Sequence, residues 1–295
     1  MSLDRREALK VLATAGAATA AAAAPAAARP RKVAPDDAVG MLFDATKCVG
    51  CKACMVACKQ ANDLAYDDPD GLWDAPVDLT GNIKTVIKLY DDGSSSSFMK
   101  AQCLHCIDPA CASACMLGAY KKREFGIVTW DGSKCVGCRY CQIACPYGVP
   151  RFEWDKALPK MVKCEMCNHR LAEGREPACT EVCPRQAVIF GRYTDLLADA
   201  KQRVASDPER YYQKVFGEKD GGGTQVLYLA GAGVDFQKLG LPDLGELSVP
   251  HLPETVQHFI YKGFVAPVAL YAALAAVMWR NRRNEDQSAA APEEV

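Results

Sequence analysis

Sixteen cysteines are the residues of this sequence whose type and spacing could do chemistry, and they fall into four groups. No cysteine occurs before Cys48 or after Cys183. The first and third groups share the spacing C-x2-C-x2-C-x3-C, while the middle gap widens to four residues in the second group and to eleven in the fourth. In chain order the groups are Cys48, Cys51, Cys54 and Cys58; Cys103, Cys106, Cys111 and Cys115; Cys135, Cys138, Cys141 and Cys145; and Cys164, Cys167, Cys179 and Cys183.

This spacing is typical of the ligands of cubane iron–sulfur clusters. Cysteines two residues apart on a curling loop can direct three thiolates at the corners of one cluster. The cysteine three residues further on usually opens a helix that leads away, and in two-cluster ferredoxins it ligates the other cluster. The four groups therefore predict four 4Fe–4S clusters, or about sixteen irons per chain, held by all the cysteines.

Two other interpretations of the cysteines remain open. An even number of cysteines also allows a disulfide framework, and C-x2-C pairs occur in zinc sites. Eight disulfides would leave the repeated spacing without explanation, and zinc would leave the third and fourth cysteine of each group without a role. An exported, disulfide-rich interaction module with no redox role is therefore the less favoured alternative.

Strand-like runs beside the cysteine groups indicate how the groups pair. The runs 118–120 and 126–131 bracket a polar turn between the second and third groups, as in a bacterial ferredoxin. Val39–Asp44 leads into the first group and 187–191 follows the fourth, so these two should pair antiparallel. The predicted fold class is α+β, with two interlocked bacterial-ferredoxin-like modules of short antiparallel strand pairs and helices, plus one C-terminal transmembrane helix.

Crossed ligation follows from this pairing, because each cluster takes three cysteines from one group and one from the partner group. No nucleophile–base pair, phosphate loop or paired carboxylate stands out, so no catalytic residue is predicted. His105, inside the second group, is expected beside a cluster or at the surface and not as a ligand. The predicted ligand sets are Cys48, Cys51, Cys54 and Cys183; Cys164, Cys167, Cys179 and Cys58; Cys103, Cys106, Cys111 and Cys145; and Cys135, Cys138, Cys141 and Cys115.

Both ends of the chain have the composition of targeting segments. Arg5 and Arg6 precede an alanine-rich run, as in a twin-arginine signal, although Ala8 stands where a bulky apolar residue is often found. Such a signal exports folded proteins, which would protect clustered cysteines from the oxidation usual outside the cytoplasm. Residues 263–279 form an uncharged stretch of 17 residues, or about 25 Å as a helix, and basic residues follow it.

The predicted organisation is a signal peptide at 1–28, a four-cluster ferredoxin-like domain at 35–200, a linker segment to the membrane at 201–258, a transmembrane helix at 259–280 and a cytoplasmic tail at 281–295. The mature protein would lie on the periplasmic face of the cytoplasmic membrane. A strand at 83–90, a turn or loop at 91–97, a helix at 192–204 and an edge strand at 225–229 are also expected. A net charge of −1 gives no sign of a nucleic-acid partner.

Several motifs resemble those of the four-cluster ferredoxin-type beta subunits of molybdopterin oxidoreductases and related complexes. They include the stretches 135–147, 163–168 and 187–191. The tail stretches 222–228, 238–242 and 257–263 resemble, within this group, the iron–sulfur subunits of periplasm-facing, membrane-bound NiFe hydrogenases.

The resemblance implies an electron-transfer subunit that is not catalytic alone. Its partners would be the hydrogenase small and large subunits, an integral membrane subunit that reduces quinone, and membrane lipid around the C-terminal helix. Formate dehydrogenase beta subunits share the four cysteine groups and a C-terminal anchor. The alternative is therefore the same relay role in a formate dehydrogenase or another molybdopterin oxidoreductase.

Overall fold

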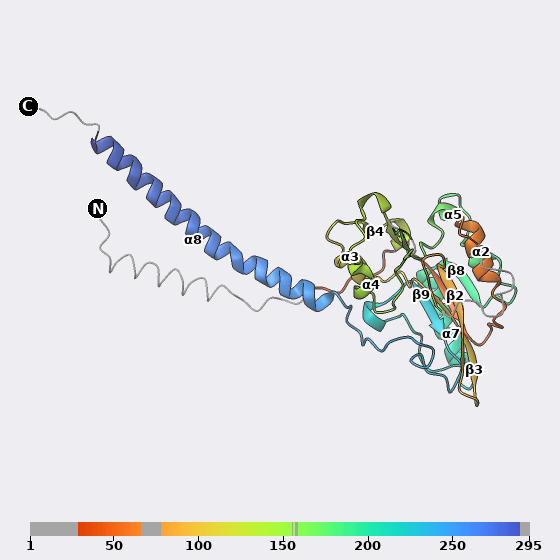
Figure 1. Cartoon of the computed structure of the whole chain (residues 1–295). Helices are drawn as coiled ribbons and strands as arrows, with labels where there is room; N and C mark the ends of the chain where they lie inside the picture. The colour runs from red at the N-terminus through yellow and green to blue at the C-terminus, as the bar shows by residue number, and fades with distance from the viewer. Residues whose placement is uncertain (1–28, 66–77, 155, 157–158, 290–295) are drawn as a thin grey trace, which may run out of the picture. The chain divides into compact units, whose positions relative to one another are not determined.

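A computed structural model describes residues 29–65, 78–154, 156 and 159–289 (Figure 1). The chain divides into a compact unit, Arg31–Pro250, and a second unit that contains the C-terminal helix. The helices and strands are β1 (Val39–Asp44), α2 (Ala53–Ala61), β2 (Thr85–Asp91), β3 (Ser96–Gln102), α3 (Ala110–Ser113), β4 (Tyr120–Lys122), η2 (Glu124–Gly126), β5 (Val128–Trp130), η3 (Gly132–Lys134), α4 (Tyr140–Ala144), β6 (Arg151–Phe152), β7 (Met161–Val162), α5 (Asn168–Ala172), α6 (Ala178–Glu181), β8 (Val188–Arg192), α7 (Tyr193–Ser206), η4 (Asp220–Gly222), β9 (Val226–Leu229) and α8 (His251–Ala289).

A three-stranded sheet in the order β8-β1-β9 ties the beginning of the compact unit to its end. Leu42 of β1 pairs antiparallel with Ile189 of β8 and parallel with Leu227 of β9. Five of the six residues of β1 are buried, as expected for a central strand covered on both faces. Gly40 is required because a Cβ there would collide with the carbonyl oxygen of Gln225. The predicted β1–β8 pairing and the predicted edge strand β9 are both confirmed.

The two ferredoxin-like modules occupy different parts of the compact unit. The pair β4–β5 is antiparallel and lies between the second and third cysteine groups, as predicted. Figure 1 shows α3, α4 and β4 together in one part of this unit and α2 and α5 in another. Helix α3 contacts α4, and α2 contacts α6, so the second group packs with the third and the first with the fourth.

The segment between the first two cysteine groups forms a hairpin of β2 and β3. Strand β2 confirms the strand predicted at 83–90. The loop predicted at 91–97 ends at Ser96, where an unpredicted strand begins. Asp92 shapes the turn because its carboxylate accepts hydrogen bonds from the amides of Ser94 and Ser95, at 3.0 and 2.9 Å.

Much of the segment expected to be a linker, 201–258, belongs to the core of the compact unit. Helix α7 confirms the predicted helix, and three aromatic residues after it, Phe216, Tyr228 and Phe236, are buried. The Phe216 ring packs against those of Tyr228 and Phe236, with centroids 6.3 and 5.2 Å apart. Many residues between the glycines and prolines of this segment therefore pack into the core.

Helix α8 contains the whole of the predicted transmembrane segment at 259–280. Among the helices that the structure describes, none is long and apolar enough to cross a membrane. The predicted signal peptide, 1–28, and the end of the predicted tail, 290–295, lie outside the described residues.

Candidate functional site

All sixteen cysteines lie in described parts of the chain, and every one is a free thiol. This finding contradicts the disulfide-framework alternative, in which eight pairs of sulfurs would be bonded. Among the described residues, no group of three or more histidine, cysteine, aspartate or glutamate side chains is placed to hold a single metal ion.

Site 1 is a cavity lined by Cys48, Cys51, Cys54 and Cys183. Burial raises the pKa of Cys48 to about 11, and the neighbouring thiols of Cys54, Cys183 and Cys51 contribute to the rise. The last cysteine of the fourth group therefore lies with the first three cysteines of the first group. This is the grouping that crossed ligation requires.

Site 2 is a second cavity, lined by Cys58, Cys164, Cys167 and Cys179. The pKa of Cys58 is raised, first by burial and then by the thiols of Cys164, Cys179 and Cys167. Cys54 and Cys58 both lie on α2, four residues apart, yet they face different cavities. One turn of this helix thus separates the two sites.

Site 3 is formed by Cys103, Cys106, Cys111 and Cys145. Burial raises the pKa of Cys106 well above its usual range, and the thiols of Cys103, Cys145 and Cys111 raise it further. Site 3 therefore joins three cysteines of the second group to the last cysteine of the third.

Site 4 contains Cys135, Cys138 and Cys141 of the third group. The pKa of Cys141 is raised mainly by burial, and Cys135 and Cys138 add to the rise. Cys115 packs against the hydrophobic cluster that contains Cys141. The structure thus brings the predicted fourth member close to the other three.

Neighbouring sites lie close enough for their thiols to interact. Burial raises the pKa of Cys103 in site 3 to about 11, and Cys164 in site 2 contributes. Burial also raises the pKa of Cys111 in site 3, with a contribution from Cys141 in site 4. Sites 1 and 2 adjoin at α2, so the four sites form a series in the order 1, 2, 3, 4.

The two modules repeat the same local geometry at their cysteines. Lys52 and Arg139 adopt the left-handed conformation, with φ of 58° and 66°, immediately before α2 and α4. Pro109 and Pro177 precede the short helices α3 and α6. A left-handed residue turns the loop sharply, so that the cysteines before it and those on the helix can face one point.

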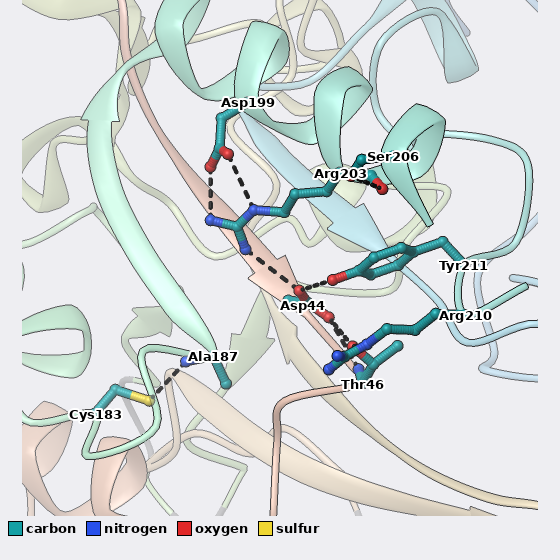
Figure 2. Close-up of polar contacts among 9 residues, drawn as sticks. All are labelled: Asp44, Thr46, Cys183, Ala187, Asp199, Arg203, Ser206, Arg210 and Tyr211. Atoms are coloured by element: carbon teal, nitrogen blue, oxygen red, sulfur yellow. Dashed lines mark hydrogen bonds and ion pairs between the residues drawn. The ribbon is translucent and has the colours of Figure 1, made fainter. Parts of the chain in front are cut away.

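Backbone amides donate hydrogen bonds to the last cysteine of two groups. The N–H of Ala187 donates to Sγ of Cys183 at 3.3 Å, as Figure 2 shows, and the N–H of Ala119 donates to Sγ of Cys115 at 3.3 Å. Hydrogen bonds of this kind stabilise negative charge on a ligating sulfur. The donor set therefore fits an iron–sulfur cluster, since each site is built of soft sulfur donors and sites 1 and 4 add amide hydrogen bonds to them.

Two buried polar residues near the sites were missed or misplaced by sequence reasoning. Lys100 is 1% exposed and lines site 1. His105 is fully buried, which excludes the surface position considered for it, and its Nδ1 accepts a hydrogen bond from the amide of Val128 at 3.0 Å. Burial lowers the pKa of His105 well below its usual value, so the ring is neutral. Lys100 is the only lysine of β3, and its surroundings in the sequence give no sign of its burial.

The fold and the four sites define a class, an iron–sulfur protein built from two interlocked ferredoxin-like modules. Residues 95–193 match the family model described as a 4Fe-4S dicluster domain. The chain is 38% identical to the hydrogenase-2 operon protein HybA of Escherichia coli O157:H7, over 84% of this chain and 86% of that protein. It is 35% identical to the formate dehydrogenase-O iron-sulfur subunit of Escherichia coli K12, over 79% of this chain and 78% of that protein.

The chain belongs to the family of iron–sulfur subunits that includes HybA and the formate dehydrogenase iron-sulfur subunits. Its sixteen cysteines, the matched domain and its family membership fit four 4Fe–4S clusters and an electron-transfer role. Its relatives are subunits for electron transfer, so the chain is not an enzyme by itself.

Proposed function

We propose that this chain carries electrons between a hydrogenase and a membrane subunit that reduces quinone. The observation that carries the electron-transfer part is the crossed grouping of cysteines around the cavities of sites 1 and 2. The hydrogenase part is supported by the similarity to HybA, which extends over 86% of that protein. When bound, each 4Fe–4S cluster accepts and releases one electron, with no chemistry on a substrate.

The proposed ligands are the four cysteines of each site. Sites 1 to 4 would hold one cluster each, through Cys48, Cys51, Cys54 and Cys183; Cys58, Cys164, Cys167 and Cys179; Cys103, Cys106, Cys111 and Cys145; and Cys115, Cys135, Cys138 and Cys141. Crossed ligation would join the first cysteine group to the fourth and the second to the third, so that cluster binding and folding support each other.

Purified protein tests this proposal directly. It should show broad visible absorption and contain about sixteen irons and sixteen acid-labile sulfides per chain. Colourless, iron-free protein of unchanged fold would contradict it.

The same relay role in a formate dehydrogenase, or in another molybdopterin oxidoreductase, is the second candidate. Similarity to formate dehydrogenase iron-sulfur subunits supports it. Reduction of the oxidised protein by catalytic amounts of hydrogenase under hydrogen, compared with formate dehydrogenase under formate, separates the two. Fast bleaching of the visible absorption with hydrogen alone supports the first candidate, and fast bleaching with formate alone supports the second.

Export and membrane attachment are also part of the proposal. Arg5 and Arg6 support twin-arginine export, which would place the compact unit on the periplasmic side. The uncharged stretch 263–279 and the arginines at 280, 282 and 283 support a single C-terminal anchor whose end stays in the cytoplasm. The proposed partners are the hydrogenase small and large subunits, the quinone-reducing subunit and membrane lipid.

A further inference from the structure

The β2–β3 hairpin is a wall shared by sites 1 and 2. Ile87 pairs across the strands with Lys100, and both side chains line site 1. Two positions along, Thr85 pairs with Gln102, and both line site 2. Because every second residue of a strand faces the same side, these two pairs lie next to each other on one face of the hairpin.

Lys100 reaches from one site to the other along this face. Its ammonium group donates a hydrogen bond to Oγ1 of Thr85 at 2.9 Å and another to Oε1 of Gln102. Lys100 and Gln102 are each 1% exposed and Thr85 is 3% exposed, so water does not screen the ammonium charge. Lys100 therefore lines site 1 while its charged end is held by two residues of site 2.

No carboxylate among the described residues forms an ion pair with Lys100. The ionisable groups that act on it are cysteines of both sites, namely Cys54 in site 1 and Cys58, Cys164 and Cys179 in site 2. These cysteines would be negatively charged thiolates when they hold a cluster. The counter-charges of this buried ammonium group would therefore belong to the two sites.

We propose that Lys100 is an electrostatic tuning residue shared by sites 1 and 2, and that it raises the reduction potentials of both clusters. This inference rests on the proposed function, since it needs clusters in both sites. An electron that enters either cluster adds one negative charge beside a desolvated ammonium group. That attraction stabilises the reduced form of the cluster and so raises its reduction potential.

Substitution of Lys100 by methionine removes the charge and keeps a side chain of similar length. Redox titration of purified protein, followed by electron paramagnetic resonance, should show that two of the four midpoint potentials fall. We expect each to fall by at least the equivalent of a tenfold change in the one-electron equilibrium constant, about 59 mV. The other two should stay unchanged. The matched control is Lys88→Met, because Lys88 lies on the same hairpin in a surface ion pair with Asp78, 2.8 Å away.

Iron analysis separates failure of this inference from failure of the proposed function. Wild-type protein without iron would contradict the proposed function. A Lys100→Met protein with full iron and four unchanged potentials would overturn the role of Lys100 alone.

If Lys100→Met does not assemble its clusters, Gln102→Glu provides the test. This variant keeps Lys100 and places a carboxylate beside its ammonium group, which should lower the same two potentials. Unchanged potentials in that variant would overturn the inference.

Discussion

The hydroxyl group of Tyr211 donates a hydrogen bond to Oδ2 of Asp44 at 2.9 Å, at the end of β1 (Figure 2). The same carboxylate accepts from Nη1 of Arg203, on α7, at 3.3 Å. The backbone amide of Asp44 donates to the carbonyl oxygen of Ala187 at 2.7 Å. The backbone amide of Ala187 in turn donates to Sγ of Cys183 in site 1. Asp44 therefore joins three distant segments of the chain directly behind the first cysteine site.

Substitution of Asp44 or Tyr211 should reduce the free energy of unfolding, and the loss should be larger for Asp44. Asp44→Ala leaves the buried hydroxyl of Tyr211 without its acceptor, while Arg203 keeps its ion pair with Asp199, so the change should cost about 1–3 kcal/mol of unfolding free energy. Tyr211→Phe removes one neutral donor and should cost about 1 kcal/mol, which lowers the melting midpoint by about 2–4 °C. Thermal bleaching of the visible absorption measures both. Ser206→Ala is the control, because Ser206 is exposed and, among the described residues, its hydroxyl bonds only the carbonyl oxygen of Arg203. Midpoints equal to that of the control would contradict the stabilising role.

Cys54 and Cys58 provide a sharp test of crossed ligation because they share helix α2 but line different sites. Cys54→Ser should alter the electron paramagnetic resonance signal of one cluster, and Cys58→Ser should alter that of another. Cys183→Ser, 129 positions away from Cys54 in the sequence, should alter the same signal as Cys54→Ser. Loss of one and the same signal in both α2 variants would refute the crossed arrangement.

The β1–β8 pairing and the crossed cysteine groups could be predicted because they follow from local patterns. Val39–Asp44 is an apolar run directly before one group, and 187–191 is a similar run directly after another. Known ferredoxin spacing then requires the two runs to meet. A single sequence shows both its hydrophobic runs and its cysteine spacing. The β1–β8 pairing and the grouping of cysteines around sites 1 and 2 could therefore be predicted from it.

Lys100 and the packed segment after α7 could not be predicted in the same way. The environment of Lys100 depends on which strand lies beside it. The polar residues of the turn at Asp92 continue into the start of β3, so this strand of the hairpin was not predicted. The glycines and prolines between 217 and 253 are typical of linkers, yet aromatic residues such as Phe216 and Tyr228 pack there against the sheet. Contacts between residues far apart in the sequence determine the burial of Lys100 and of these aromatic residues, and no local sequence pattern shows such contacts.

Lys163 offers a second test of charge near the cysteine sites. Its buried ammonium group donates to the carbonyl oxygens of Val128 and Cys164, and its charge acts on the thiol of Cys103 in site 3. Lys163→Met should therefore lower the reduction potential of the site 3 cluster. Redox titration measures the shift, with the exposed Lys160→Met as control. A site 3 potential equal to that of the control would show that the charge of Lys163 does not tune this cluster.

Removal of residues 259–295 should release the protein from membranes without loss of its clusters. The compact unit, Arg31–Pro250, contains every cysteine, so the shortened chain should keep about sixteen irons. Many apolar side chains of α8 are exposed, among them Val265, Tyr271 and Trp279, and burial of such surface in lipid is favourable. The protein is expressed in cells that lack the partner subunits, so that the helix is its only proposed attachment to the membrane. Extraction of the membranes with alkaline carbonate then measures how firmly the protein is held.

Replacement of the arginines at 280, 282 and 283 by serine is the control, because it keeps the apolar stretch and should leave the protein in the membrane fraction. A full-length chain that carbonate extracts completely would contradict the anchor, because a peripheral protein is released by this treatment whereas a lipid-spanning helix is not.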